Sequence, residues 1–373
     1  MKILFINRYH IQDIPGGGGE YAMYVYAKAL ANLGHEVSIA SFDIGDGKPK
    51  FERIEDTYDA YRVKGFRMSG LSRIPGFAKL AKKIKPDIIL MSTYVYTTHG
   101  YFIAKLCGCK VASFIHDEFE VYGFRKPFNL FFIFNRIFTK MVDGIISDTQ
   151  TLSKIIEKET GVKCSVSYIG FDLPPHRKKE IYRQYSDTGK PFRFVFVGRF
   201  VKAKGMDYLL NAFKKYNSFY PNSECIFIGG GEYLEEFKEK YKNVKGIKIM
   251  GYLPEDEMLE TLADSDIFVN PTYLKEGIVL VNIQSMKIGL PMIVTNTGAS
   301  SEVVRNGIDG ILVTPRDEDE LYREMVRLSL DAELQKTLAG AAMTRSEEFN
   351  ASDSGKRLEK ILINIVNKGK ENE

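Results

Sequence analysis

Long hydrophobic runs are absent from this chain of 373 residues. Its apolar runs are short, such as residues 3–6 and 130–134, whereas a membrane-spanning helix needs about 20 apolar residues. The start of the chain carries an early lysine and an apolar run that is too short for the hydrophobic region of a secretory signal. These absences predict a cytoplasmic protein.

Cysteine is also scarce. The chain has 4 cysteines, too few and too scattered for a disulfide framework, at positions 107, 109, 164 and 225. Cys107 and Cys109 lack the second cysteine pair that a structural zinc site would use, so we expect no metal there. Hydrophobic residues make up 44% of the chain and charged residues 27%, which excludes wholesale disorder.

Positive charge is concentrated in the first half of the chain. Residues 1–190 contain 28 Lys and Arg against 20 Asp and Glu, a net +8, and the remainder contains 24 against 28, a net −4. Residues 62–85 hold eight cations and no acid, and in residues 124–140 cations alternate with phenylalanines. Two interpretations stay open: a solvated basic face over a packed core, or contact with an anionic membrane surface. No nucleic-acid motif accompanies the charge.

Short β-rich runs alternate with helical segments along the whole chain, which predicts parallel sheets in an α/β fold. The expected strands lie at residues 2–6, 36–42, 87–93, 110–115, 144–149, 192–198, 224–230, 247–253, 266–272, 292–296 and 310–313. We predict two doubly wound, Rossmann-like domains facing a central cleft. Their expected bounds are 1–172 and 191–350, with a linker over 173–190 and a final helix within 351–373 that returns to the first domain.

Three motifs could bind an anionic ligand. Residues 16–19 are four glycines between a strand and a helix, an arrangement that favours phosphate but also suits a surface turn. Arg199 and Lys204 follow the strand that ends at Gly198. Two cations at this place could bind an anion, or they could be two exposed surface cations without a ligand. Glu276 and Gln284 are eight positions apart across a strand–helix junction, about 12 Å if helical throughout.

These motifs occur in an order that resembles the family 4 glycosyltransferases, retaining enzymes of the GT-B fold. The resemblance is carried by GGGGE with GHEV (34–37), VGRFVKAKG, IGGGEYLEEF (228–237), GYLPEDEM (251–258), DIFVNPTYLKEG and residues 289–313. It is strongest over residues 194–313 and weaker over 45–110, where such enzymes recognise their acceptors.

The resemblance implies roles for individual residues. Arg199 and Lys204 would hold a nucleotide diphosphate, while Glu276 and His116 would orient the donor sugar. These four residues form the predicted catalytic set. The predicted donor-binding set comprises Gly17, Gly18, Gly19, Arg199, Lys204, Gly230, Leu253, Gly277, Ile278, Val279, Leu280 and Gln284.

One position departs from the family pattern. The family's E-x7-E motif ends in a glutamate that accepts hydrogen bonds from the ribose hydroxyls, and Gln284 stands there instead. Because a charged hydrogen bond contributes about 1.5–3 kcal/mol and a neutral one about 0.5–1.5 kcal/mol, we expect weaker or altered nucleotide binding. A further motif, Asp264-Ser265-Asp266, spells the D-x-D of metal-dependent transferases but lies between a helix and a strand, where aspartates favour turns.

The sequence therefore predicts a retaining hexosyltransferase that needs no metal or other cofactor. It would use a nucleotide-diphospho-sugar and a glycan or lipid-linked acceptor, in cell-envelope polysaccharide or glycoconjugate synthesis. The expected location is the cytoplasm, with an anionic inner membrane surface as a further partner. A nucleotide-sugar epimerase, a sugar phosphorylase and a non-catalytic subunit on the same scaffold remain alternatives.

Overall fold

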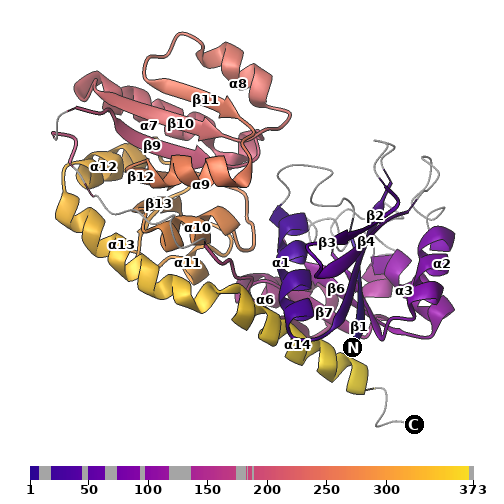
Figure 1. Ribbon diagram of the computed structural model, residues 1–373. Helices are drawn as coiled ribbons and strands as arrows, with labels where there is room; N and C mark the ends of the chain where they lie inside the picture. Colours follow the sequence, from indigo (N-terminus) through magenta and orange to yellow (C-terminus); the bar gives the residue numbers. More distant parts are fainter. Residues whose placement is uncertain are drawn as a thin grey trace. The chain divides into compact units, whose positions relative to one another are not determined.

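The computed structural model describes residues 1–7, 18–43, 49–63, 74–92, 97–116, 136–173, 182, 184–186 and 189–368 (Figure 1). The chain divides into two compact units. Unit 1 comprises Met1–Gly170 together with Asn350–Glu373, and unit 2 comprises Phe171–Phe349.

An eight-stranded sheet forms the centre of unit 1, in the order β3-β4-β2-β1-β5-β6-β7-β8. Only β3 is antiparallel to its neighbour. The strands are β1 (Lys2–Ile6), β2 (Glu36–Phe42), β3 (Phe51–Ile54), β4 (Tyr58–Val63), β5 (Ile88–Met91), β6 (Lys110–Ile115), β7 (Gly144–Ser147) and β8 (Cys164–Val166). The central strands are nearly all apolar because helices cover both of their faces.

Helices pack on both faces of this sheet, with α1 and α14 on one side and α2 and α3 on the other (Figure 1). The helices of unit 1 are α1 (Gly18–Asn32), α2 (Ile74–Ile84), α3 (Thr97–Cys107), α6 (Gln150–Thr160) and α14 (Ala351–Asn367). Gly355 of α14 lies so close to α1 that an added Cβ would be 2.6 Å from the Ala29 Cβ. A hydrogen bond between the His35 Nε2 and the Glu359 Oε1, at 2.7 Å, also links this helix to the rest of unit 1.

The sheet of unit 2 has six strands, all parallel, in the order β11-β10-β9-β12-β13-β14. They are β9 (Phe192–Val197), β10 (Ser223–Ile228), β11 (Ile247–Gly251), β12 (Ile267–Asn270), β13 (Met292–Thr295) and β14 (Ile311–Val313). Each overlaps a strand expected from the sequence. The core beside this sheet is rich in buried phenylalanine, including Phe194, Phe196 and Phe227.

The helical elements of unit 2 connect its strands or follow the last of them. They are η4 (Lys202–Lys204), α7 (Met206–Phe219), α8 (Leu234–Tyr241), α9 (Glu255–Ala263), α10 (Leu280–Ile288), α11 (Ser300–Val303), α12 (Glu318–Ser329), α13 (Ala332–Ser346) and η5 (Glu347–Phe349). Within the described part of the chain, none of the helices is both long and apolar enough to cross a membrane.

Asp207, in the first turn of α7, ties this helix to the α8 region. It accepts hydrogen bonds from Tyr233, Lys240 and Tyr241. Burial by itself would raise the pKa of the Asp207 carboxyl, but these hydrogen bonds outweigh burial and hold the pKa below its ordinary value.

The chain passes between the two units at two adjacent places. On the unit 2 side, the Phe171 N–H donates to the Phe349 carbonyl oxygen at 2.9 Å. On the unit 1 side, an added Cβ at Gly170 would lie 2.1 Å from the Asn350 carbonyl oxygen. Tyr182, within the segment expected to be a linker, donates to the Gly289 carbonyl of unit 2 at 2.8 Å.

Candidate functional site

The carboxyl ends of the parallel strands of unit 2 meet at one edge of its sheet, where ligands of such sheets bind. Neighbouring loops at this edge are joined directly, because the Gly229 N–H donates to the Gly251 carbonyl at 2.7 Å. The loops after β9, β10 and β11 carry three of the predicted donor-binding positions, Arg199, Gly230 and Leu253.

The glycines after β10 have different roles. Gly229 has a φ of 137° and an added Cβ would lie 1.9 Å from the Gly198 carbonyl oxygen, so only glycine fits there. The same holds for Gly231, where a Cβ would lie 2.5 Å from the Phe200 oxygen. In contrast, apart from Gly230 itself and its two chain neighbours, no atom of the described residues lies within 4 Å of the Cβ position of Gly230. Of the three glycines, Gly230 is therefore the one that has room for a ligand beside it.

Lys204 and Glu276, two predicted catalytic residues, form an ion pair. The Lys204 Nζ donates to the Glu276 Oε2 at 2.8 Å, and the two side chains are 10% and 22% exposed. The Thr272 hydroxyl lies 3.4 Å from the same carboxylate oxygen. The loops after β9 and β12 are thus joined by a largely buried charge pair, whereas Arg199, on the first of these loops, is exposed.

The backbone around Lys204 is fixed by close approach to the loop after β12. Gly205 has a φ of 76°, and an added Cβ would lie 2.0 Å from the Pro271 carbonyl oxygen. The Tyr273 N–H donates to the Ala203 carbonyl at 3.0 Å. These backbone contacts hold the segment that carries Lys204 at the carboxyl edge of the sheet.

The loop after β13 positions Glu276. The Ala299 N–H donates to the Glu276 carbonyl at 3.0 Å, and an added Cβ at Gly298 would lie 2.3 Å from that same oxygen. The helix α10 begins only at Leu280, so the length of about 12 Å expected for a continuous helix from Glu276 to Gln284 does not apply. Val279 at its N-cap position has no polar side chain to cap the first N–H groups.

Gln284 is buried in α10, and its side chain faces α9. The Gln284 Nε2 donates to the Glu255 Oε1 at 3.4 Å. Glu255 is exposed in the first turn of α9, just after Leu253. The amide that replaces the expected second acid therefore has a carboxylate of another helix beside it.

In unit 1, His116 follows β6 and lies next to the start of α1. An added Cβ at Gly19 would be 3.5 Å from the His116 Cδ2, and the imidazole stacks on Phe114 with ring centroids 4.6 Å apart. Its Nδ1 lies 3.8 Å from the Asp148 Oδ2. Gly18 and Gly19 belong to the first turn of α1 rather than to a preceding loop, and Gly17 lies outside the described residues.

The Asp264-Ser265-Asp266 motif has a structural role, because Asp266 bonds to the backbone of Arg193 in β9 and Asp264 ends α9. The Asp266 Oδ2 accepts from the Arg193 N–H at 2.7 Å, and the Asp266 N–H donates to the Arg193 carbonyl. Asp264 caps the end of α9. Across the described residues, no group of three or more His, Cys, Asp or Glu side chains is placed to hold a metal ion.

A surface of unit 1 combines apolar and basic side chains. We call it the α3 patch; its exposed members are Phe102, Lys105, Leu106, Arg136, Ile137, Lys140 and Met141. Phe138 connects the two segments, since its ring centroid lies 5.0 Å from that of Tyr101 and 5.1 Å from that of Phe102.

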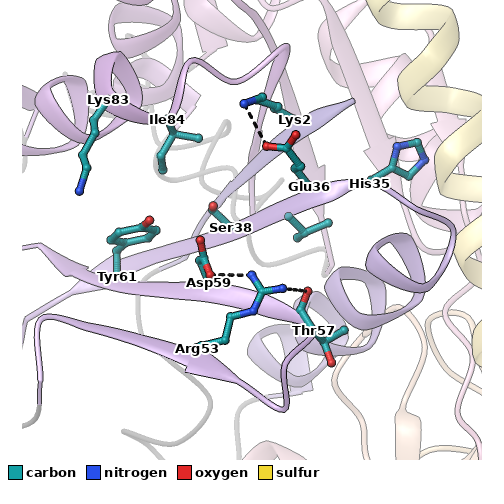
Figure 2. Close-up of a pocket in the computed structure, with 11 residues that line it drawn as sticks. Lys2, His35, Glu36, Ser38, Arg53, Thr57, Asp59, Tyr61, Lys83 and Ile84 are labelled. Atoms are coloured by element: carbon teal, nitrogen blue, oxygen red, sulfur yellow. Dashed lines mark hydrogen bonds and ion pairs between the residues drawn. The ribbon is translucent and has the colours of Figure 1, made fainter.

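Figure 2 shows a pocket of unit 1 at the amino ends of β2 and β4. Lys2 pairs with Glu36 at 3.0 Å and Arg53 with Asp59 at 2.7 Å, so each acid already faces a cation. This pocket lies at the end of the strands opposite to the one that carries His116, and we assign it no part in the candidate site.

Two family models match the sequence. The model described as Glycosyltransferase Family 4 matches residues 16–173, and the model described as Glycosyl transferases group 1 matches residues 191–331. The matched segments together account for most of both units. The chain belongs to the family 4, group 1 glycosyltransferases.

Sequence matches to relatives of this glycosyltransferase cover much of its length. It is 29% identical over 315 residues to the Escherichia coli UDP-Gal:alpha-D-GlcNAc-diphosphoundecaprenol alpha-1,3-galactosyltransferase, covering 78% of this chain and 79% of the relative. It is 25% identical over 381 residues to the Campylobacter jejuni GalNAc-alpha-(1->4)-GalNAc-alpha-(1->3)-diNAcBac-PP-undecaprenol alpha-1,4-N-acetyl-D-galactosaminyltransferase, covering 98% and 99% of the two chains.

Solved structures bear on the fold of the glycosyltransferase. Anabaena Alr3699/HepE in complex with UDP-glucose has a TM-score of 0.80 at 19% identity, covering 98% of this chain and 100% of that one. The GT-B fold predicted from the sequence is confirmed.

Three neighbours of the predicted residues, two in unit 2 and one in unit 1, do not follow from the sequence motifs. Glu255, Thr272 and Asp148 lie next to predicted residues but were not singled out. Thr272 and Asp148 each come just after a strand, a signal that could have found them. Glu255 lies at the start of a helix, and its distance from Gln284 in the sequence gives no sign that the two side chains meet.

Proposed function

We propose that this glycosyltransferase moves a hexosyl unit from a nucleotide-diphospho-sugar to a hydroxyl of a lipid-linked or other glycan acceptor. The observation that carries the donor part is the Lys204–Glu276 pair beside the uncapped start of α10. A cation, a further exposed cation at Arg199 and N–H groups at a helix N-terminus are the groups that bind a diphosphate. UDP-Gal in the name of the Escherichia coli relative and UDP-glucose bound to Anabaena HepE support this donor class.

The proposed chemistry depends on stabilising the leaving diphosphate. As the bond between the anomeric carbon and the diphosphate oxygen breaks, negative charge grows on that oxygen. Arg199, Lys204 and the N–H groups from Gly277 to Leu280 would stabilise it from fixed positions, so the proposal requires no metal. The acceptor oxygen bonds to the same face of the sugar, its proton passes to the departing diphosphate oxygen, and configuration is retained.

Glu276 and His116 have orienting roles in this proposal rather than roles as covalent nucleophile and base. The Glu276 carboxylate, held by Lys204, can accept hydrogen bonds from sugar hydroxyls. The role of His116 toward the sugar rests on the family resemblance.

The decisive experiment is incubation with a panel of UDP- and GDP-hexoses and an undecaprenyl-diphosphate-linked sugar, in excess chelator. We expect transfer, with the anomeric configuration of the product equal to that of the donor by NMR. An inverted product would refute retention, and transfer restored only by added Mg²⁺ or Mn²⁺ would refute metal independence. Release of an altered nucleotide or sugar without acceptor would favour the epimerase alternative. Absence of nucleotide binding would favour a non-catalytic subunit.

We further propose that the α3 patch brings the protein to an anionic membrane surface that carries the acceptor. The patch offers both exposed apolar side chains for the headgroup region and cations for anionic lipids. Both relatives described above have acceptors on undecaprenol in their names, which supports a lipid-linked acceptor.

Vesicle sedimentation tests the membrane proposal. We expect binding to vesicles of anionic lipid that weakens as salt is raised, because exposed charges are screened over about 10 Å at 0.1 M salt. Replacing Leu106 and Ile137 by serine should abolish it, whereas Phe219→Ser, at an exposed position of unit 2, should not. Binding that is unchanged in the Leu106 and Ile137 variant would contradict this role of the patch.

A further inference from the structure

We infer that Glu255 supplies the carboxylate for the ribose hydroxyls of the donor nucleotide, taking over from the acid that Gln284 replaces. The inference deepens the proposed function and rests on it. It starts from the pair of side chains at 3.4 Å, Gln284 Nε2 and Glu255 Oε1.

The chemistry of the pair suits a diol. Both hydroxyls of a ribose can donate hydrogen bonds, and a carboxylate is an acceptor with about four lone-pair positions. Gln284 is 6% exposed and offers one amide donor to the carboxylate, whereas Glu255 is exposed to solvent. Gln284 is thus a positioning residue that orients Glu255, and Glu255 is the group that can reach a ligand.

The place of the pair also suits ribose. Leu253, two residues before Glu255, follows β11 at the edge that carries Gly230. Gln284 lies about 6 Å along the helix axis from Leu280, where α10 begins. The pair therefore connects the start of α9, next to the loop after β11, with the helix whose N-terminus is proposed to hold the diphosphate. Ribose connects base and diphosphate in the same way.

The pairing also explains why position 284 is not an acid here. A glutamate at 284 would place two carboxylates in contact, and like charges at this distance repel. With Gln284 and Glu255 the pair keeps one negative charge, carried by α9 instead of α10. The two side chains are therefore expected to exchange places without loss of function.

The test measures binding of UDP and GDP to the full chain by titration calorimetry, together with their 2′-deoxy analogues. Glu255→Gln should weaken binding of the ribonucleotide about tenfold and remove most of the preference for ribose over deoxyribose. Glu257→Gln is the matched control, since Glu257 is an exposed acid in the same first turn of α9. It should change neither quantity.

The exchanged variant separates ligand binding from a structural effect. Glu255→Gln combined with Gln284→Glu should restore affinity to within about threefold of the wild type. If the wild type binds UDP or GDP but Glu255→Gln keeps its affinity and its ribose preference, the inference is wrong and the proposed function stands. If the wild type binds neither nucleotide, both are wrong.

Discussion

Replacing Lys204 by methionine would remove the charge that Glu276 faces while keeping much of the aliphatic side chain. At 2.8 Å the gross attraction is about 6 kcal/mol for an effective dielectric of about 20, but the cost of desolvating the ammonium group offsets most of it. Losing one partner of a fully buried pair costs about 3–5 kcal/mol. Because the Glu276 side chain is 22% exposed, water can partly solvate it, and we expect a loss of about 2 kcal/mol in the free energy of unfolding.

The effect on the donor is expected to be separate from the effect on stability. Losing a charged hydrogen bond of about 1.5–3 kcal/mol would raise the Kd of the nucleoside diphosphate roughly 10- to 150-fold. Adding Glu276→Gln to Lys204→Met removes the unpaired carboxylate, so stability should recover to within about 1 kcal/mol while nucleotide affinity stays low.

Urea unfolding and titration calorimetry measure the two effects. The control is Lys202→Met on the same short helix, because Lys202 pairs with Glu236 at the exposed surface, where an ion pair contributes about 0–1 kcal/mol. An affinity of Lys204→Met within twofold of the wild type would refute the assignment of Lys204 to the diphosphate.

Three other perturbations test the site and the fold. Arg199→Ala should lower kcat/KM more than tenfold with little change in stability, and Lys214→Ala, which removes another exposed cation of unit 2, should change neither. Gly229→Ala should cost about 2 kcal/mol or more in unfolding experiments, because its Cβ would meet a backbone oxygen at 1.9 Å, and Gly230→Ala should cost little. Asp207→Asn should destabilise the protein at pH 7, and the difference should shrink as the pH falls below 3.8, because the lowered pKa of Asp207 makes its contribution disappear on protonation. Equal unfolding curves for the two glycine variants, or a pH-independent deficit for Asp207→Asn, would contradict these arguments.

The strands were predictable from the sequence where burial produces a strong pattern of apolar residues. Central strands such as β1 and β13 are continuous apolar runs, because both of their faces are covered, and they were predicted. The pattern missed β3, β4 and β8. β4 contains Asp59 and Arg62, and Arg62 occupies a buried position, so its apolar pattern is interrupted. β3 and β8 are short strands at the sheet edges, where burial leaves a weaker signal.

The candidate site was predictable to the extent that it follows strands. Residues such as Arg199 and Glu276 come after strands of one parallel sheet, and topology brings such positions to one edge. Side-chain partners across helices were not predictable in this way. Whether Gln284 faces Glu255 depends on how α9 packs against α10, which no local spacing in the sequence determines.

The return of α14 to unit 1 has a consequence for biosynthesis. Unit 2 is continuous in the sequence and all of its residues have been translated by Phe349, whereas unit 1 lacks α14 until the chain from Asn350 onward leaves the ribosome. The surface of α1 around Ala29, which Gly355 contacts in the finished protein, stays uncovered during this interval. The amino-terminal half of the nascent chain therefore completes its folding after the middle of the chain has been made.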